Sequence, residues 1–288
     1  MVAAAPWLFL TFWSSGFVAA KIGLRGAEPL TFLALRFALV TLVMAGIAGL
    51  RRSPWPRTRA ELVPVVVTGL LMQAVYFGCT YLAFAAGVGA GALALIVGLQ
   101  PLLTAVVAGP FLGERVRPIQ WLGLVLGLVG VALVLEDKLA LGASTATGVI
   151  WSFLGLFAIT GGTLYQKRFA GAFDLWSGGA VQFAVATLVV APVAAASETM
   201  RIAWSWPFAS ALAYLVLMNS IVAITLLTIM IRRGEASRVT SLFFLVPPGA
   251  AFVAWLVLAE RLSLVQLAGM AVATGGVGLV MRRASTVK

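Results

Sequence analysis

The sequence predicts an all-α integral membrane protein in which ten transmembrane helices form two inverted five-helix repeats. Three observations predict this fold: the composition, a series of long apolar stretches and an internal repeat. Of the 288 residues, 62% are hydrophobic and 10% are charged, and the mean hydropathy is +1.07. So few polar residues cannot cover a water-facing surface. The composition therefore excludes soluble enzymes and secreted modules.

Each apolar stretch has a length of about 20 residues, which is enough to cross the hydrocarbon of a bilayer. The first contains Pro6, Trp7 and Lys21, lacks a basic leader and runs into the second. We therefore expect it to be retained rather than cleaved as a signal peptide. The ten expected spans are 6–24, 30–50, 61–84, 89–112, 118–135, 147–166, 174–197, 206–231, 237–258 and 263–281.

The net charge of +11 and the isoelectric point near 11.1 come from basic residues in short loops, not from one amphipathic face. This placement indicates membrane topology rather than nucleic-acid binding. On the side shared with the N-terminus lie about 14 of the 20 Lys and Arg residues. By the positive-inside rule, both termini are expected in the cytoplasm.

The single cysteine, Cys79, permits no internal disulfide, and the chain has no histidine. The cysteine therefore gives no metal-binding spacing, and the histidine that usually serves as metal ligand and proton shuttle is missing. We expect no metal and no cofactor.

Residues 86–135 align with residues 232–281 at a shift of about 146, with identical residues at about 15 of 50 positions. Each copy holds an odd number of spans, so the second enters the membrane from the opposite side. We expect the repeats to be 1–140 and 141–288. Inverted repeats are the architecture of alternating access. The matched pairs include Leu99 with Leu245, Pro101 with Pro247, Glu114 with Glu260, Arg115 with Arg261, and, more weakly upstream, Gly16 with Gly162 and Lys21 with Lys167.

Several of these elements together resemble the EamA-type carriers of the drug/metabolite transporter superfamily. They are the stretch from Trp13 to Lys21, the stretches 99–115 and 245–261, and the glycine-spaced fifth and tenth spans. The resemblance covers essentially the whole chain. It implies a ten-helix transporter of the bacterial inner membrane with both termini inside, many of whose relatives export amino acids or other metabolites.

Proline interrupts spans 4 and 9 near their middles, at Pro101 and at Pro247 and Pro248. A missing amide frees backbone carbonyls in a medium without water, and paired breaks of this kind point to a central binding site. A tolerated kink that only shapes packing is the alternative.

Polar and aromatic residues cluster in spans that the resemblance places around the cavity. Such a mixture suits an amphipathic organic solute. Alternatively, a Ser or Thr bonds back to its own helix, Gln100 bonds a neighbouring helix, and Trp151 belongs to an interface belt. The candidate substrate-binding residues are Trp13, Ser14, Phe17, Lys21, Tyr76, Thr80, Tyr81, Gln100, Trp151, Tyr165, Gln166, Asn219 and Ser220.

Lys21 and Arg36 are charges inside expected spans. Either they snorkel to the outer interface, or one of them meets a carboxylate or phosphate of the solute or neutralises a helix end. No carboxylate and no histidine lies in the middle of a span, so facilitated export or exchange remains open as the mechanism.

Glu114 and Glu260 directly precede spans 5 and 10, and Arg115 and Arg261 follow them. We expect each carboxylate to complement the N-terminus of the helix that it precedes and to pair with its neighbouring arginine. The glycines of spans 5 and 10 are expected to pack within the two halves, and a homodimer face is an alternative.

The expected function is a secondary carrier in the lipid bilayer that exports small organic solutes, such as amino acids or related amphipathic metabolites, by alternating access. The protein is not expected to be an enzyme. Two alternatives remain at this point: a channel, and a membrane-embedded enzyme acting on lipid-linked substrates, which would need clustered acids or metal ligands.

Overall fold

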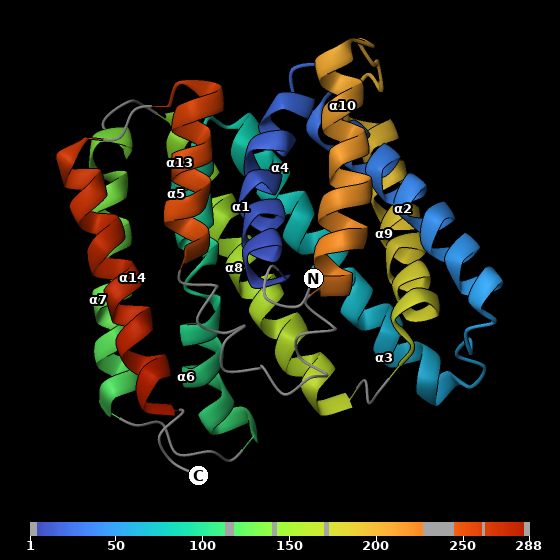
Figure 1. Cartoon of the computed structure of the whole chain (residues 1–288), viewed down its shortest axis with the longest axis horizontal. Helices are drawn as coiled ribbons and strands as arrows, with labels where there is room; N and C mark the ends of the chain where they lie inside the picture. The colour runs from blue at the N-terminus through green and yellow to red at the C-terminus, as the bar shows by residue number, and fades with distance from the viewer. Residues whose placement is uncertain are drawn as a thin grey trace.

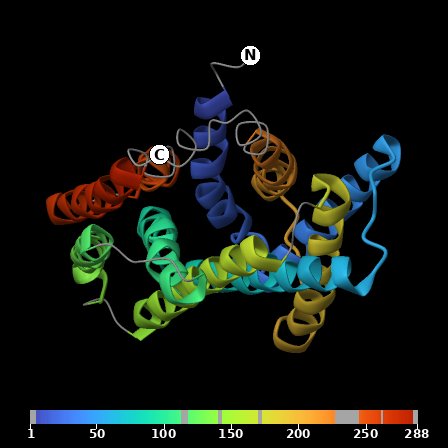
Figure 2. The same ribbon diagram turned by 90° about the horizontal axis from the view of Figure 1, so that it is seen from below.

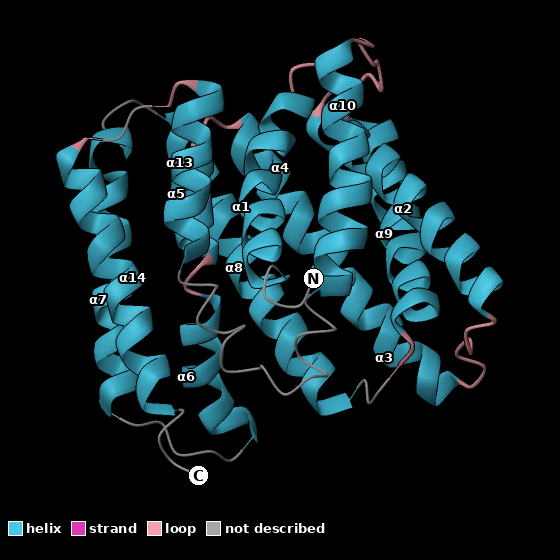
Figure 3. Ribbon diagram, in the orientation of Figure 1, coloured by secondary structure: helices cyan, strands magenta, loops and turns pink. Residues whose placement is uncertain are grey.

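The computed structural model describes residues 5–112, 118–139, 143–169, 173–226, 245–260 and 263–284. Within these ranges every regular element is helical, as Figure 3 shows. The elements are α1 (Ala5–Gly23), α2 (Pro29–Arg51), α3 (Arg59–Gly69), η2 (Leu70–Val75), α4 (Tyr76–Ala85), α5 (Ala90–Val97), α6 (Gln100–Leu112), α7 (Pro118–Leu139), α8 (Ala143–Phe169), α9 (Leu175–Ser197), α10 (Trp206–Tyr214), η3 (Leu215–Ala223), α13 (Val246–Leu258) and α14 (Leu264–Ala284).

Several of these elements are parts of one continuous span. The π-helical turn η2 joins α3 to α4, and the π-helical segment η3 continues α10. With α5 and α6 taken as one broken span, the described residues form the ten expected spans, and the predicted fold class is confirmed. Five of the helices are long and apolar enough to cross a membrane, for example Pro29–Arg51 and Leu175–Ser197.

Helix ends follow local capping chemistry. The Asp174 carboxylate accepts hydrogen bonds from the backbone N–H groups of Trp176 and Ser177 at the start of α9. Thr58 and Glu61 form a reciprocal capping box at the start of α3. Such caps satisfy amides that have no partner within the helix and fix where each span begins.

The packing of the helices repeats when the two halves are exchanged. Figures 1 and 2 show α7 beside α14 at one edge of the bundle and α2 beside α9 toward the other. Helix α5 packs on α13, α4 packs on α8, and α1 packs on α10 and η3. If spans 1–5 and spans 6–10 exchange places, the α4–α8 contact becomes the α1–η3 contact. The pairs α2–α9, α5–α13 and α7–α14 are unchanged by the exchange. The packing therefore has the symmetry of an inverted repeat.

Glycines allow the close approach of α7 and α14. A Cβ atom added at Gly130 would collide with the Gly269 carbonyl oxygen, and one added at the matched Gly276 would lie 2.8 Å from the Leu126 Cβ. Our expectation that these glycines pack within each half is therefore wrong: they join the two halves. The reason is that the fifth span of each repeat has its partner in the other repeat.

Candidate functional site

Helices α1, α2 and α4 meet the π-helical segment η3 around a small cavity. Its volume is about 30 Å³, room for about two water molecules. The first three elements belong to the first repeat and η3 to the second, so the cavity lies between the halves. The lining residues are Trp13, Gly16, Phe17, Ala20, Arg36, Tyr76, Phe77, Thr80, Tyr81, Phe84 and Asn219. We call this set the central cavity.

The two π-helical segments occupy matching places in the two repeats. A shift of about 146 carries residues 70–75 of η2 onto residues 216–221, which lie within η3. The same shift carries Gln73 onto Asn219. A π-helical turn widens the helix locally and is frequent at functional sites. In this protein it presents Asn219 to the central cavity and both Asn219 and Ser220 to Arg36.

Arg36 forms the polar centre of the site. Its side chain is 2% exposed. Its Nη1 donates a hydrogen bond to the Tyr81 hydroxyl at 3.0 Å, and its Nη2 donates to Asn219 Oδ1 at 3.0 Å and to Ser220 Oγ at 3.1 Å. The guanidinium also lies over the Phe77 ring, 4.8 Å from its centroid. Arg36 thus ties α2 and α4 of the first repeat to η3 of the second.

This environment shows that the snorkelling interpretation of Arg36 is wrong. Three neutral acceptors and an aromatic face hold the guanidinium inside the bundle, so it does not turn toward an interface. Sequence reasoning did not include Arg36 among the binding residues. The available signal was an arginine within a long apolar span, since such a residue usually faces the interior of a bundle and marks a functional pathway.

Asn219 is held in a fixed orientation. Its Nδ2 donates to the Phe12 carbonyl oxygen at 3.2 Å while its Oδ1 accepts from Arg36. Gly16 of α1 provides the space, because a Cβ atom at that position would collide with the Asn219 amide. Asn219 therefore connects α1, α2 and η3 at the point where the two repeats meet.

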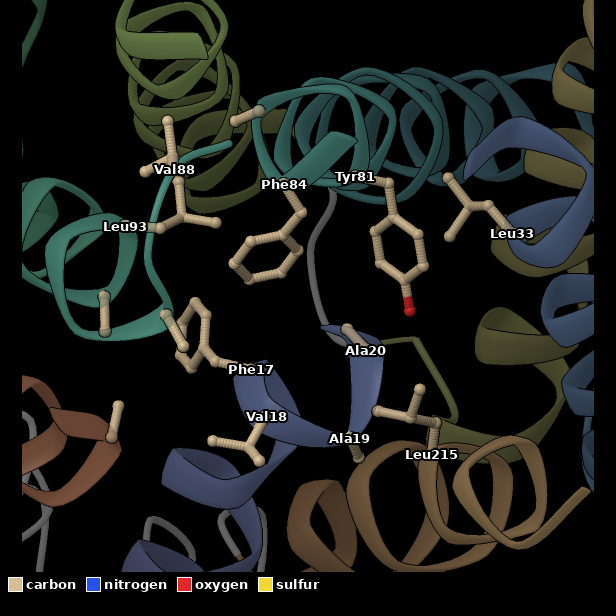
Figure 4. Close-up of a cluster of buried hydrophobic side chains, with 14 of the residues drawn as sticks. Phe17, Val18, Ala19, Ala20, Leu33, Tyr81, Phe84, Val88, Leu93 and Leu215 are labelled. Carbon is tan, nitrogen blue, oxygen red and sulfur yellow. The ribbon is translucent and has the colours of Figure 1, made fainter. Parts of the chain in front are cut away.

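Two aromatic rings, from Phe17 and Phe84, line the central cavity between α1 and α4. Figure 4 shows Phe17 of α1 and Phe84 of α4 turned into the space between these helices. Phe84 also lines a second, open depression of about 670 Å³, whose charged residues are Lys21, Arg25, Glu28 and Arg201. Phe84 thus separates the central cavity from a mainly basic depression at this end of the bundle, which we call the Lys21 end.

Lys21 forms an ion pair at this end. Its Nζ lies 2.7 Å from Glu260 Oε1, and both side chains are partly exposed. Glu260 also accepts a hydrogen bond from the Ala90 backbone N–H at 3.2 Å. The ion pair therefore connects α1 to the segment before α14 and to the N-terminus of α5. The partner of Lys21 is therefore a carboxylate of the protein and not the membrane–water interface.

Glu260 complements a helix N-terminus, as predicted, but it is not the N-terminus of the helix that follows it in the sequence. Glu260 complements the N-terminus of α5, and its cationic partner is Lys21. At the start of α14, Ser263 and Gln266 cap each other's backbone N–H groups instead. The left-handed backbone of Ala259, with φ of 55°, ends α13 directly before Glu260. Glu114, Arg115 and Arg261 lie outside the described residues.

The predicted break in span 4 is present. Helix α5 ends at Val97 and α6 begins at Gln100, with Pro101 as its second residue. The Gln100 side chain donates to Thr163 Oγ1 at 2.9 Å, which is the helix-to-helix bond that was the alternative to solute binding. In span 9, Pro247 and Pro248 stand in the first turn of α13, where a missing N–H costs no helical bond. Residues 227–244, which precede it, lie outside the description.

Several predicted residues do not reach the central cavity. The Ser14 hydroxyl donates to the Val246 carbonyl oxygen at 3.4 Å and so links α1 to α13. Trp151, Tyr165 and Gln166 lie on α8 and are not among the lining residues. Tyr165 packs on Phe169 with ring centroids 4.8 Å apart. Of the predicted set, Trp13, Phe17, Tyr76, Thr80, Tyr81 and Asn219 line the cavity, and Ser220 bonds to its arginine.

Ten apolar spans in two halves, with a cavity around a buried arginine between the halves, are typical of a membrane transporter of the inverted-repeat class. The chain belongs to the EamA-like transporter family, whose sequence pattern matches residues 4–136 and again residues 146–282. The family is part of the drug/metabolite transporter superfamily and is not an enzyme family. The alternative of a membrane-embedded enzyme is therefore dropped.

Several bacterial transporters resemble the chain along most of its length. It is 25% identical over 268 residues to the "Uncharacterized inner membrane transporter YedA" of Escherichia coli, covering 93% of this chain and 86% of that protein. It is 25% identical to a "Probable amino-acid metabolite efflux pump" of the same species, covering 91% and 88%. It is 27% identical to a "Probable terminal-alkyne amino-acid exporter" of Streptantibioticus cattleyicolor, covering 96% and 92%.

A solved structure titled "Crystal structure of protein" has the same fold. It superposes with a TM-score of 0.69 at 17% identity and covers 99% of both chains. The chain, a multi-pass membrane protein of a transporter family, thus shares the fold of that solved structure.

Proposed function

We propose that this protein exports small organic solutes, namely amino acids or related amphipathic metabolites, by alternating access. The observation that carries the proposal is the position of Arg36, which belongs to the first repeat and is bound by Asn219 and Ser220 of the second. A solute that binds at Arg36 competes with contacts between the halves. Binding is thereby coupled to their relative movement.

The lining of the central cavity supports an organic solute. Rings from Trp13, Phe17 and Tyr76 offer apolar contact area, and a few polar groups set orientation. In the described residues no Asp or Glu lines the cavity, so we propose facilitated export or exchange rather than proton coupling through a buried carboxylate. The names of two relatives, an amino-acid metabolite efflux pump and an amino-acid exporter, support this solute class.

The proposal includes an orientation in the bacterial inner membrane with both termini in the cytoplasm, and repeats at 1–140 and 141–288. The excess of basic residues on the side of the termini supports it. Reporter fusions after Arg59 and after Lys138 test it. We expect the first to report the cytoplasm and the second the outside, and the reverse pattern would contradict the orientation.

Efflux from right-side-out vesicles tests export. Vesicles loaded with a mixture of labelled amino acids are diluted, and loss of label is compared for wild type, Arg36→Gln and the control Gly46→Ala, whose position on α2 has open space around it. We expect fast loss of at least one amino acid with wild type and the control, and background loss with Arg36→Gln. Equal rates in all three would contradict the proposal.

The homodimer also remains a proposal. Gly275 of α14 has open space around it, in contrast to Gly276, which faces α7. This exposed position leaves a small-residue face for a second copy. Mass measurement of the purified protein in lipid nanodiscs tests it: a dimer mass is expected, and a monomer mass would contradict it.

A further inference from the structure

Two side chains of the central cavity carry buried polar atoms without hydrogen-bond partners among the described residues. They are the Nε of Arg36 and the Oγ1 of Thr80. Arg36 is 2% exposed and Thr80 is 4% exposed. Both residues line the same cavity. A buried polar group without a partner costs free energy, so each such group in a native structure calls for an explanation.

Thr80 differs from most other threonines of the described helices. A threonine in a helix can donate its hydroxyl proton to the carbonyl oxygen four residues earlier, which leaves it no donor for an anionic ligand. Thr80 does not do this, and although the Tyr76 hydroxyl is close enough to affect Thr80 electrostatically, the two side chains form no hydrogen bond of normal geometry. Its hydroxyl is therefore available inside the cavity. The threonines that bond back to their own helix are Thr41, Thr68, Thr160, Thr163, Thr187 and Thr225.

The charge of Arg36 is not balanced by the residues that bind it. Tyr81, Asn219 and Ser220 are neutral acceptors, and no carboxylate pairs with Arg36 in the part of the chain that the structure describes. Neutral acceptors satisfy N–H groups, but they leave a buried cation uncompensated in a medium of low dielectric constant. An anion in the cavity would supply both the missing charge and the missing acceptors.

We propose that the central cavity takes the carboxylate group of the solute, which accepts hydrogen bonds from Arg36 and Thr80. This inference rests on the proposed function and narrows its substrate class to organic acids and amino acids. A cavity of about 30 Å³ accommodates such a group but not a whole amino acid. The remainder of the solute displaces the rings of the cavity wall, foremost Phe17 and Phe84, which face each other between α1 and α4.

The depression at the Lys21 end agrees with an anionic group on the solute. Three basic residues, Lys21, Arg25 and Arg201, line it together with one acid, Glu28. Phe84 stands between this depression and the central cavity. The excess of basic over acidic residues in this depression favours a carboxylate over an amine there.

Thermal unfolding of the purified protein in detergent tests the carboxylate directly, without transport. The probes are L-phenylalanine and L-leucine, their amides, the amine phenethylamine, the acid 3-phenylpropionate and sodium chloride. We expect at least one acid to raise the Tm and its amide, the amine and chloride to leave it unchanged, because a ligand that binds the folded state stabilises it. Equal shifts with acid and amide, no shift with any acid, or a shift with chloride alone would overturn the proposal.

Thr80→Val and Thr80→Ser are a matched pair of variants that test whether the Thr80 hydroxyl binds the carboxylate of the solute. Valine has the shape of threonine without the hydroxyl, so Thr80→Val should leave the Tm of the ligand-free protein unchanged or raise it. We expect it to weaken acid binding about tenfold, while Thr80→Ser keeps the affinity within a few-fold. Unchanged affinity in Thr80→Val would overturn the role of Thr80.

Different results would contradict the proposed carboxylate site and the proposed export function. If the protein exchanges amides or amines and no acid raises its Tm, the transporter proposal stands and the proposed carboxylate site is contradicted. Stabilisation by acids without any exchange of them would keep the site and remove export.

Discussion

At the scale of single residues, the central cavity depends on one arginine and on the groups that fix it. Asn219 and Ser220 hold the guanidinium from the second repeat and Tyr81 holds it from the first. Arginine suits this place because its planar fork reaches several acceptors at once, which the single ammonium of lysine does not.

Replacing Arg36 by lysine keeps the charge but cannot maintain three hydrogen bonds to separate acceptors. We expect the exchange rate to fall at least about tenfold. Solute exchange in proteoliposomes, normalised to the amount of reconstituted protein, is the measurement. A rate within twofold of wild type would show that charge alone suffices.

The close approach of α1 and η3 gives a second prediction. Gly16→Ala adds a methyl group that collides with the Asn219 amide, whereas Gly46→Ala adds one in open space. We expect Gly16→Ala to lower the Tm and the exchange rate, because Asn219 must leave its bonds to Arg36 and Phe12. Gly46→Ala should leave both near wild type. Indistinguishable variants would contradict the packing of Asn219 on α1.

Asp174 gives a prediction on pH. Burial raises its pKa, but hydrogen bonds from the Ser177 backbone, Ser53 and Trp176 outweigh burial, so the pKa of Asp174 lies below its usual value. A carboxyl with a lowered pKa contributes stability above its unfolded pKa and loses it as the pH falls through the folded pKa. Asp174→Asn should therefore cost stability, about 1 kcal/mol at most, at pH 7 and less at pH 3. Urea unfolding at both values measures it, and an equal cost at both would contradict it.

At the scale of elements, the Lys21–Glu260 pair joins α1, α5 and the start of α14. If the pair holds these elements together, Lys21→Met and Glu260→Gln change exchange by the same factor, and the double variant is no worse than either. If Lys21 instead binds the solute, Lys21→Met alone raises the KM. Initial exchange rates at several solute concentrations separate the two outcomes.

The sequence predicts the spans and the break after Val97 well, because the bilayer imposes the length of each span and proline imposes the break. The faces of the helices are harder to predict. Trp151, Tyr165 and Gln166 resembled cavity residues, but the rotation of α8 about its axis depends on packing against α4 and α6. For Arg36 the sequence left two interpretations open, because its place in the sequence does not show the acceptors that η3 brings to it.

At the scale of the whole molecule, the inverted symmetry and the central cavity are parts of the same proposed transport mechanism. The pairs α2–α9, α5–α13 and α7–α14 each contain one helix from each half. The π-helical segments η2 and η3 also stand at matching positions. Exchanging the conformations of two such halves turns a cavity that is open on one side of the membrane into one open on the other.

Counterflow in proteoliposomes tests alternating access by the central cavity most directly. Liposomes loaded with an unlabelled amino acid are diluted into a trace of the labelled compound, and its uptake is followed over time. A carrier that alternates between two states exchanges the two, so we predict a transient, saturable accumulation of label that Arg36→Gln abolishes. Uptake that rises only to equilibrium, unaffected by the unlabelled amino acid inside, would contradict alternating access and indicate a channel.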